Sequence, residues 1–153
     1  LVTQAAGRRM VEQIQGGIAQ GGRIINTSST SGLIGSFGQA NYGSAKAGIA
    51  GLTRVSAIEF RKHGITVNAI VPIAKTRMTE DLGIVPDDFG PEKVSPLVVF
   101  LASDLAKDVT GRIFGIQGRE AKEYRLQITD GATASGEMWT PQEIAERFAE
   151  IAR

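Results

Sequence analysis

Residues 22–48 read GRIINTSSTSGLIGSFGQANYGSAKAG, and this stretch decides the fold. It opens with a short run rich in β-branched residues, Arg23 to Thr27, which is typical of a buried strand. Ser28 to Gly38 is rich in Gly and Ser and has neither the helical nor the strand period, which indicates a loop. The Ala-rich segment from Gln39 to Lys62 predicts a long helix that Gly64 ends. A short buried strand followed by a long helix is typical of a parallel α/β unit.

The same alternation of helices and strands continues on both sides of this stretch. The sequence predicts a helix over 3–19, strands over 66–71 and 112–116, a polar loop over 74–90, a helix within 91–103, an irregular tail from 118, and a last helix opened by Thr140-Pro141-Gln142-Glu143. Strands that alternate with helices indicate a parallel sheet with helices on both faces. With right-handed crossovers, the expected fold class is α/β, as the C-terminal part of a Rossmann-type doubly wound parallel sheet.

The composition excludes several classes of protein. Hydrophobic residues are 42% and charged residues 22% of the 153, which is ordinary for a globular domain. The net charge is +1 without a basic stripe, so no nucleic-acid partner is expected. No apolar run is long enough to cross a membrane, and the absence of cysteine is compatible with a cytoplasmic location. The single histidine, His63, lacks the partners of a metal site, so no metal is expected.

Three side chains are candidates for chemistry because ligands of an open parallel sheet bind outside the carboxyl ends of its strands. Ser29 follows the first strand, and Tyr42 and Lys46 lie four residues apart on one face of the next helix. An ammonium about 4 Å from a phenol favours the phenolate by roughly 4 kcal/mol in a partly screened site, which suits general acid/base catalysis. A serine hydroxyl can hydrogen-bond a substrate oxygen. None of the three carries electrons, so any hydride must come from a cofactor.

Taken alone, the Tyr-x-x-x-Lys spacing favours a half-exposed aromatic beside a solvated lysine. The surrounding sequence favours the catalytic interpretation. The segments GRIINTSS (22–29), GQANYGSAKAG (38–48), GITVNAIVP (64–72) and DVTGRIFGI (108–116) resemble the catalytic part of the short-chain dehydrogenase/reductase family. The resemblance covers roughly residues 1–118.

The resemblance implies that Tyr42 is the acid/base, that Lys46 supports it and holds the nicotinamide ribose, and that Ser29 binds the reacting oxygen. The implied cofactor is NAD or NADP, and the implied substrate is a small carbonyl compound or alcohol. Pro72, Ala74 and Thr76 match the family positions that meet the nicotinamide carboxamide. Here the sequence departs from the family, because Ile73 replaces the usual glycine and the segment 72–78 is one residue short.

Residues 72–78, 95–99 and Trp139-Thr140-Pro141 resemble a narrower group. This group is the dehydrogenase part of the peroxisomal multifunctional enzyme of fatty-acid β-oxidation and its bacterial relatives, which implies a 3-hydroxyacyl-CoA substrate. No glycine-rich phosphate loop occurs in the sequence. We therefore expect the nucleotide-phosphate half to be missing, with 1–118 as the catalytic part and 119–153 as a C-terminal extension. Such a chain would be inactive by itself, and the alternative is a non-catalytic remnant that acts as a packing or interaction module.

The resemblance also implies a homodimer or homotetramer through the helices 3–19 and 39–62. The longer helix is apolar on more than one side, whereas a helix packed only against its own sheet has one apolar stripe. Ala57 is expected on its outer face. The alternative is that the tail from Gly118 covers this helix within one chain.

Overall fold

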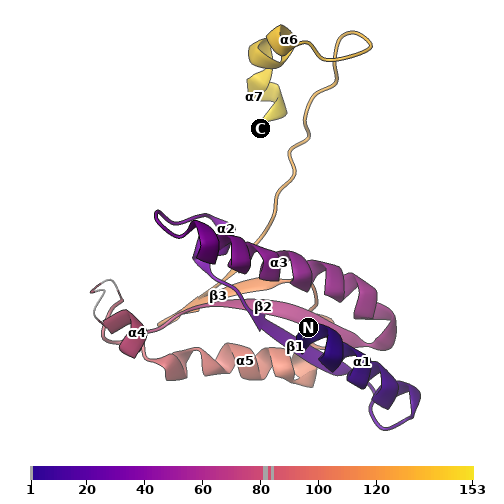
Figure 1. Ribbon diagram of the computed structural model, residues 1–153, viewed down its shortest axis with the longest axis vertical. Helices are drawn as coiled ribbons and strands as arrows, with labels where there is room; N and C mark the ends of the chain where they lie inside the picture. The colour runs from indigo at the N-terminus through magenta and orange to yellow at the C-terminus, as the bar shows by residue number, and fades with distance from the viewer. Residues whose placement is uncertain (1, 81–82, 84) are drawn as a thin grey trace.

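The computed structural model describes residues 2–80, 83 and 85–153. The elements follow in the order α1 (Val2–Gln15), β1 (Gly22–Thr27), α2 (Thr30–Leu33), α3 (Ala40–Phe60), η1 (Arg61–His63), β2 (Ile65–Ile73), α4 (Arg77–Glu80), η2 (Pro91–Lys93), α5 (Ser95–Ala102), η3 (Asp104–Ala106), β3 (Ile113–Gln117), β4 (Glu120–Tyr124), α6 (Pro141–Glu146) and α7 (Phe148–Ile151). They form a layered α/β body, from which the C-terminal segment extends as an arm (Figure 1). The predicted α/β class is confirmed.

The sheet has the strand order β1-β2-β3-β4. β1, β2 and β3 are parallel, with Thr27 opposite Ile70 and Ile70 opposite Phe114. β2 is buried at every residue from Ile65 to Val71, as expected for a central strand that helices cover on both faces. This arrangement of parallel strands and covering helices is part of a Rossmann-type fold.

Helices cover both faces of the sheet (Figure 1). α1 and α3 pack on one face, where Ala57 and the half-buried Met10 and Phe60 contact Ile65 and Val67. On the other face, α5 and η3 bury an apolar cluster around Ile70, namely Leu101, Ala106, Val94, Leu97 and Val98. The sheet is therefore packed on both faces, and the ends of its parallel strands form the carboxyl edge.

Two predicted loops contain short helices, and the predicted irregular tail begins with a strand. α2 lies within 28–38, where the Ser29 side chain caps its first turn, and α4 lies within 74–90. β4 pairs antiparallel with β3 through a hairpin in which Gly118 has a φ of 49°. The sequence missed these elements because caps and strand pairing leave no period in a segment of four or five residues.

The predicted boundaries of the longer elements also need correction. α1 ends at Gln15 and not at residue 19, because Gly16 and Gly17 follow and Gly17 is left-handed, with a φ of 71°. α3 begins at Ala40, ends at Phe60 and continues as η1, and the predicted last helix divides at Arg147 into α6 and α7. The three predicted strands are shifted or extended by one or two residues.

The expected outer position of Ala57 is wrong. Ala57 is 1% exposed and contacts the core beside Ile24 and Ile65. The large apolar residues that α3 exposes are instead Leu52, Val55 and Ile58, which are 45%, 53% and 70% exposed. α3 therefore does have two apolar sides, but Ala57 belongs to the side that faces the sheet.

The C-terminal arm leaves the body after β4 and ends in α6 and α7 (Figure 1). Its tip is held together by its own contacts. Thr129 Oγ1 donates to the Ile151 carbonyl at 2.7 Å, and the Arg147 guanidinium lies 5.2 Å from the centroid of the Trp139 ring. The division of the chain at residue 118 into a catalytic part and an extension stays a prediction.

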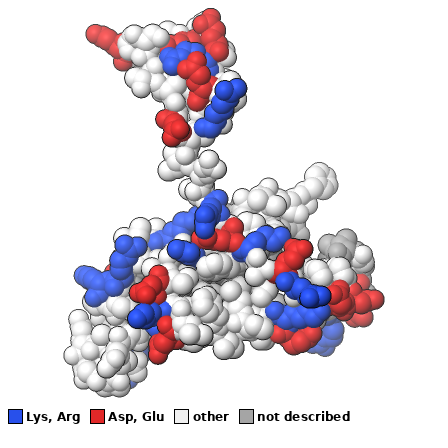
Figure 2. Space-filling model, turned by 180° about the vertical axis from the view of Figure 1, so that it is seen from behind, with Lys and Arg blue, Asp and Glu red and all other residues white. Residues whose placement is uncertain are grey.

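Basic and acidic side chains are interspersed over the face that Figure 2 shows, without a broad field of one sign. Among the described residues, no helix is both long and apolar enough to span a membrane.

Candidate active site

The predicted site lies at the carboxyl edge of the parallel sheet. β1 ends at Thr27, directly before Ser28 and Ser29, and β2 ends at Ile73. Because Thr27 pairs with Ile70, the ends of the two strands are neighbours. α3 begins at Ala40, so its first two turns lie against the same edge.

Lys46 connects α3 to the end of β1. Its Nζ donates a hydrogen bond to the Thr27 carbonyl at 3.0 Å and lies 5.6 Å from the centroid of the Tyr42 ring. This second distance is within the range of a cation–π contact. Tyr42 is 44% exposed, so its side chain is open to a ligand while its other side faces the ammonium. The fold therefore brings Tyr42 and Lys46 together.

A second set of contacts fixes the backbone of α3 at Lys46. The buried Ser28 donates from its hydroxyl to the Lys46 carbonyl at 2.8 Å. A Cβ added at Gly32 would lie 2.5 Å from the Ala47 nitrogen and 2.5 Å from the Lys46 carbonyl carbon, so only glycine allows α2 this close to α3. Neither Ser28 nor Gly32 was among the site residues predicted from the sequence. A glycine inside the Ser-rich loop was the available signal, since glycine often marks a close approach of two backbones.

Ser29 is half-buried and is the N-cap residue of α2. Its hydroxyl oxygen accepts a hydrogen bond from the Ser31 N–H at 3.3 Å. A hydroxyl that accepts in this way still has its own proton to donate. Ser29 belongs to the segment that Ser28 and Gly32 hold against α3, and its hydrogen bonds among the described residues do not include Tyr42.

The three predicted cofactor residues lie at and beyond the end of β2, at the same edge of the sheet. Pro72 is still within β2 and pairs with Ile116. The Ala74 carbonyl accepts from Thr79 Oγ1 at 3.0 Å, and the exposed Thr76 donates its N–H to Thr79 Oγ1 at 2.8 Å. Within the described part of the chain, no hydrogen bond joins these three residues to Tyr42 or Lys46.

An ion pair links the two ends of the segment that follows β2. The Lys75 ammonium donates to the Asp87 carboxylate, and the Lys75 N–H donates to the Phe89 carbonyl at 2.6 Å. The hydrogen bond with Lys75 holds the pKa of Asp87 below its usual value, and the same bond raises the pKa of Lys75. Lys75 is therefore bonded to both Asp87 and Phe89 beside the site.

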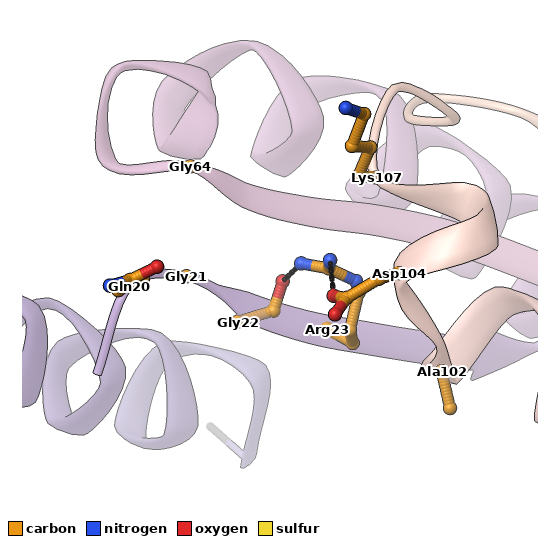
Figure 3. A pocket seen from close by; sticks show the side chains of 8 residues that line it. All are labelled: Gln20, Gly21, Gly22, Arg23, Gly64, Ala102, Asp104 and Lys107. Carbon is orange, nitrogen blue, oxygen red and sulfur yellow. Dashed lines mark hydrogen bonds and ion pairs between the residues drawn. The ribbon is translucent and has the colours of Figure 1, made fainter.

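A cavity lies at the opposite, amino edge of the sheet. It has a volume of about 740 Å³ and is formed around Gly22, Arg23, Gly64, Asp104 and Lys107. Figure 3 shows the Arg23 guanidinium in its middle, hydrogen-bonded to the Gly22 carbonyl at 3.0 Å and to the Asp104 carboxylate at 3.1 Å. None of the predicted catalytic residues lines it, so this cavity is not part of the acid/base site.

Comparison with known proteins identifies the family. The sequence model described as short chain dehydrogenase matches residues 1–84, which is more than half of the chain. The chain belongs to the short-chain dehydrogenase family, as the resemblance predicted.

The relatives carry related names. The chain is 41% identical over 138 residues to the peroxisomal hydratase-dehydrogenase-epimerase of Saccharomyces cerevisiae, covering 85% of this chain and 15% of that protein. It is 39% identical over 132 residues to the hydroxyacyl-CoA dehydrogenase ChsB1 of Mycobacterium tuberculosis, covering 80% of this chain and 42% of that protein. A crystal structure of a short chain dehydrogenase from Mycobacterium avium superposes with a TM-score of 0.80 at 43% identity, covering 97% of this chain and 50% of that chain. The 153 residues therefore span half or less of these relatives.

Proposed function

We propose that this chain provides the acid/base part of an NAD- or NADP-dependent oxidoreductase that interconverts a secondary alcohol and a ketone. The observation that carries the proposal is the position of the Lys46 ammonium, between the Thr27 carbonyl at 3.0 Å and the Tyr42 ring at 5.6 Å. Because its hydrogen bond fixes the ammonium, its charge acts on the phenol from a set direction. A positioned phenol beside a fixed cation is suited to general acid/base catalysis.

Ser29, Tyr42 and Lys46 each have a separate role in this proposal. In the direction of reduction, the Tyr42 phenol gives its proton to the substrate oxygen, and in oxidation the phenolate takes a proton from the alcohol. Lys46 stabilises the anionic form of the phenol through its charge. Ser29 donates its hydroxyl proton to the substrate oxygen and orients it toward Tyr42.

The residues at this edge fit the nicotinamide part of the cofactor. Lys46 Nζ uses one donor on Thr27, and a lysine ammonium has three, so two remain for ribose hydroxyls. Pro72, Ala74 and Thr76 offer backbone groups and one hydroxyl to the carboxamide. When bound, the nicotinamide supplies the hydride for reduction or accepts it in oxidation.

The substrate class that we propose is a 3-hydroxyacyl-CoA. The name of one relative, the hydroxyacyl-CoA dehydrogenase ChsB1, supports it, and the peroxisomal hydratase-dehydrogenase-epimerase is also named as a dehydrogenase. Large apolar side chains are also exposed near the site. Ile34 and Phe37, between α2 and α3, are 76% and 105% exposed, and Met78 in α4 is 89% exposed. An acyl chain would cover such side chains favourably.

We further propose that residues outside these 153 supply the nucleotide-phosphate loop and that the isolated chain does not turn over substrate. In this view 1–118 is the catalytic part of a Rossmann-type domain and 119–153 is an extension. The sheet supports the view because, in the described part of the chain, β1 has a strand on one side only.

A cytoplasmic location remains a prediction. The exposed Leu52, Val55 and Ile58 of α3 support a homodimer or homotetramer through α1 and α3.

The test is a chimera in which the segment that precedes the matching region in ChsB1 is joined before residue 1. Reduction of NAD or NADP is then followed with a 3-hydroxyacyl-CoA and, for comparison, with a simple secondary alcohol. Turnover by the chimera and none by the isolated chain supports the proposal. A chimera that folds and binds the cofactor but turns over neither substrate contradicts it and favours the interaction-module alternative.

A further inference from the structure

We propose that a second pocket, at the amino edge of the sheet, binds a phosphate group. The pocket has a volume of about 510 Å³ and lies between η1, the start of β2 and the connection from η3 to β3. We call it the basic pocket, and the residues that carry the argument are Arg61, Thr66, Lys107, Asp108, Thr110 and Arg112. It lies at the end of the sheet opposite to Tyr42 and Lys46 and is independent of the proposed reaction.

The charge of the lining favours an anion. Three cations, Arg61, Lys107 and Arg112, face one carboxylate, Asp108, which gives these residues a net charge of +2 at neutral pH. Arg112 has a partner outside the pocket, since its Nε lies 3.8 Å from Glu123 Oε1. Among the described residues, Arg61 and Lys107 have no carboxylate within 4.0 Å. Two cations from different elements are thus available to a ligand at the same pocket.

The lining also has hydroxyl donors without acceptors. Thr66 is 5% exposed, and its Oγ1 has no hydrogen-bond partner within the part of the chain that the structure describes. Thr110 Oγ1 accepts from the Val67 N–H at 3.0 Å, which leaves the hydroxyl proton of Thr110 without an acceptor there. A buried donor without a partner is unfavourable, and a rotation of the Thr66 side chain toward the pocket would let a bound oxyanion accept from its hydroxyl.

The neighbouring cavity around Arg23 does not share these properties. Arg23 there is neutralised by Asp104 at 3.1 Å, and Figure 3 shows the Lys107 side chain directed away from that pair. That cavity adjoins β1, which in the described part of the chain has a neighbouring strand on one side only. The basic pocket adjoins β2, which lies between β1 and β3. Lys107 lines both cavities, but in the basic pocket three cations stand against one carboxylate, whereas in the cavity around Arg23 two cations stand against one.

Phosphate is the oxyanion that this set of groups fits best. Guanidinium groups recognise phosphate oxygens through paired N–H donors, and a lysine adds a point charge. The pocket has more volume than a single phosphate ion needs, so it can take an inorganic phosphate or the phosphate end of a small phosphorylated molecule. Both sources share the same chemistry, and the experiment has to distinguish them.

The test uses the 153-residue chain and needs no enzymatic activity. Inorganic phosphate and glycerol 3-phosphate are titrated separately at constant ionic strength, with amide chemical shifts as the readout and chloride as the control. We expect saturable shifts at Gly64, Thr66 and Thr110, and none at Tyr42. Tighter binding of glycerol 3-phosphate indicates a phosphorylated metabolite, and equal binding indicates the inorganic ion.

Matched variants separate the pocket from general charge. Lys107→Gln and Arg61→Gln should each weaken phosphate binding by about tenfold or more, whereas Lys62→Gln, which removes the same charge outside the pocket, should leave it within about twofold. Thr66→Val should weaken binding without lowering the stability of the free chain, because it removes a donor that has no partner. Equal weakening by Lys62→Gln and Lys107→Gln, unchanged binding in Thr66→Val, or shifts located elsewhere would overturn the proposal.

Discussion

A methyl group added at residue 32 should disturb the candidate site, because Gly32 is where α2 packs against α3 next to Lys46. In Gly32→Ala, the new Cβ would meet the Ala47 nitrogen and the Lys46 carbonyl carbon at 2.5 Å and the Lys46 Cβ at 2.7 Å. Two of these atoms are backbone, so they cannot rotate away, and α2 has to move from α3. The hydrogen bond of 2.8 Å from Ser28 to the Lys46 carbonyl lies beside this contact and would lengthen.

The expected loss of stability can be taken from the effect of overpacking in other protein interiors. Extra carbon atoms in a well-packed interior cost about 1–3 kcal/mol, and for a domain of this size each kcal/mol lowers the melting temperature by roughly 2–4 °C. The assay is urea unfolding of the isolated chain, followed by circular dichroism, at a concentration low enough to keep it monomeric. We expect the free energy of unfolding of Gly32→Ala to fall by at least about 1 kcal/mol.

The matched control is Gly48→Ala. Gly48 lies in α3, close in sequence to Lys46, but a Cβ added there has no atom within 4 Å. In a helix interior, alanine is more favourable than glycine by about 1 kcal/mol, so this variant should gain stability. If Gly32→Ala is as stable as the wild type while Gly48→Ala shows its gain, α2 does not contact α3 as described.

Three further predictions concern Ser28, the exposed side of α3 and the Lys75–Asp87 pair. Ser28→Ala should lower the free energy of unfolding by about 1 kcal/mol, and Ser28→Thr should restore part of it if the hydroxyl reaches the Lys46 carbonyl; unfolding curves test this. Val55→Glu should turn the proposed dimer into a stable monomer by light scattering, whereas Ala57→Glu should unfold the chain because Ala57 is in the core; a dimeric Val55→Glu protein contradicts the interface. The Lys75–Asp87 pair lowers the pKa of Asp87 and raises that of Lys75, so the pair should persist at neutral pH. Its contribution should be lost as the pH falls through the lowered pKa of Asp87 and as it rises through the raised pKa of Lys75. Amide shifts of Lys75, Asp87 and Phe89 that do not move at either end of the pH range would contradict it.

The sequence predicted the parts of the fold that rest on long patterns. The β-branched run ending at Thr27 and the Ala-rich segment after Gln39 became β1 and α3, because burial of apolar side chains selects strand or helix over many residues. It did not predict α2, α4 or β4. These depend on the Ser29 cap, on the Thr76–Thr79 bonds and on pairing with β3, which are single contacts between particular atoms.

The candidate site was likewise predicted only in part from the sequence. The four-residue spacing of Tyr42 and Lys46 predicted that they share a helix face, and the 5.6 Å contact agrees with it. The acceptor of the lysine, the Thr27 carbonyl, could not be predicted, since the position of a backbone oxygen depends on how the strand docks on the helix. The error at Ala57 has a similar origin, because helical spacing alone does not say which of two apolar sides faces the sheet.

The central claim is that Tyr42 is the acid/base. Its most direct test is the turnover of the ChsB1 chimera carrying Tyr42→Phe, with Tyr124→Phe as the control, since Tyr42 and Tyr124 are the two tyrosines of the chain. We predict a loss of about 10²–10⁴-fold in turnover for Tyr42→Phe, with nearly unchanged cofactor affinity, and little change for Tyr124→Phe. Retention of more than about a tenth of the rate by Tyr42→Phe would contradict the account.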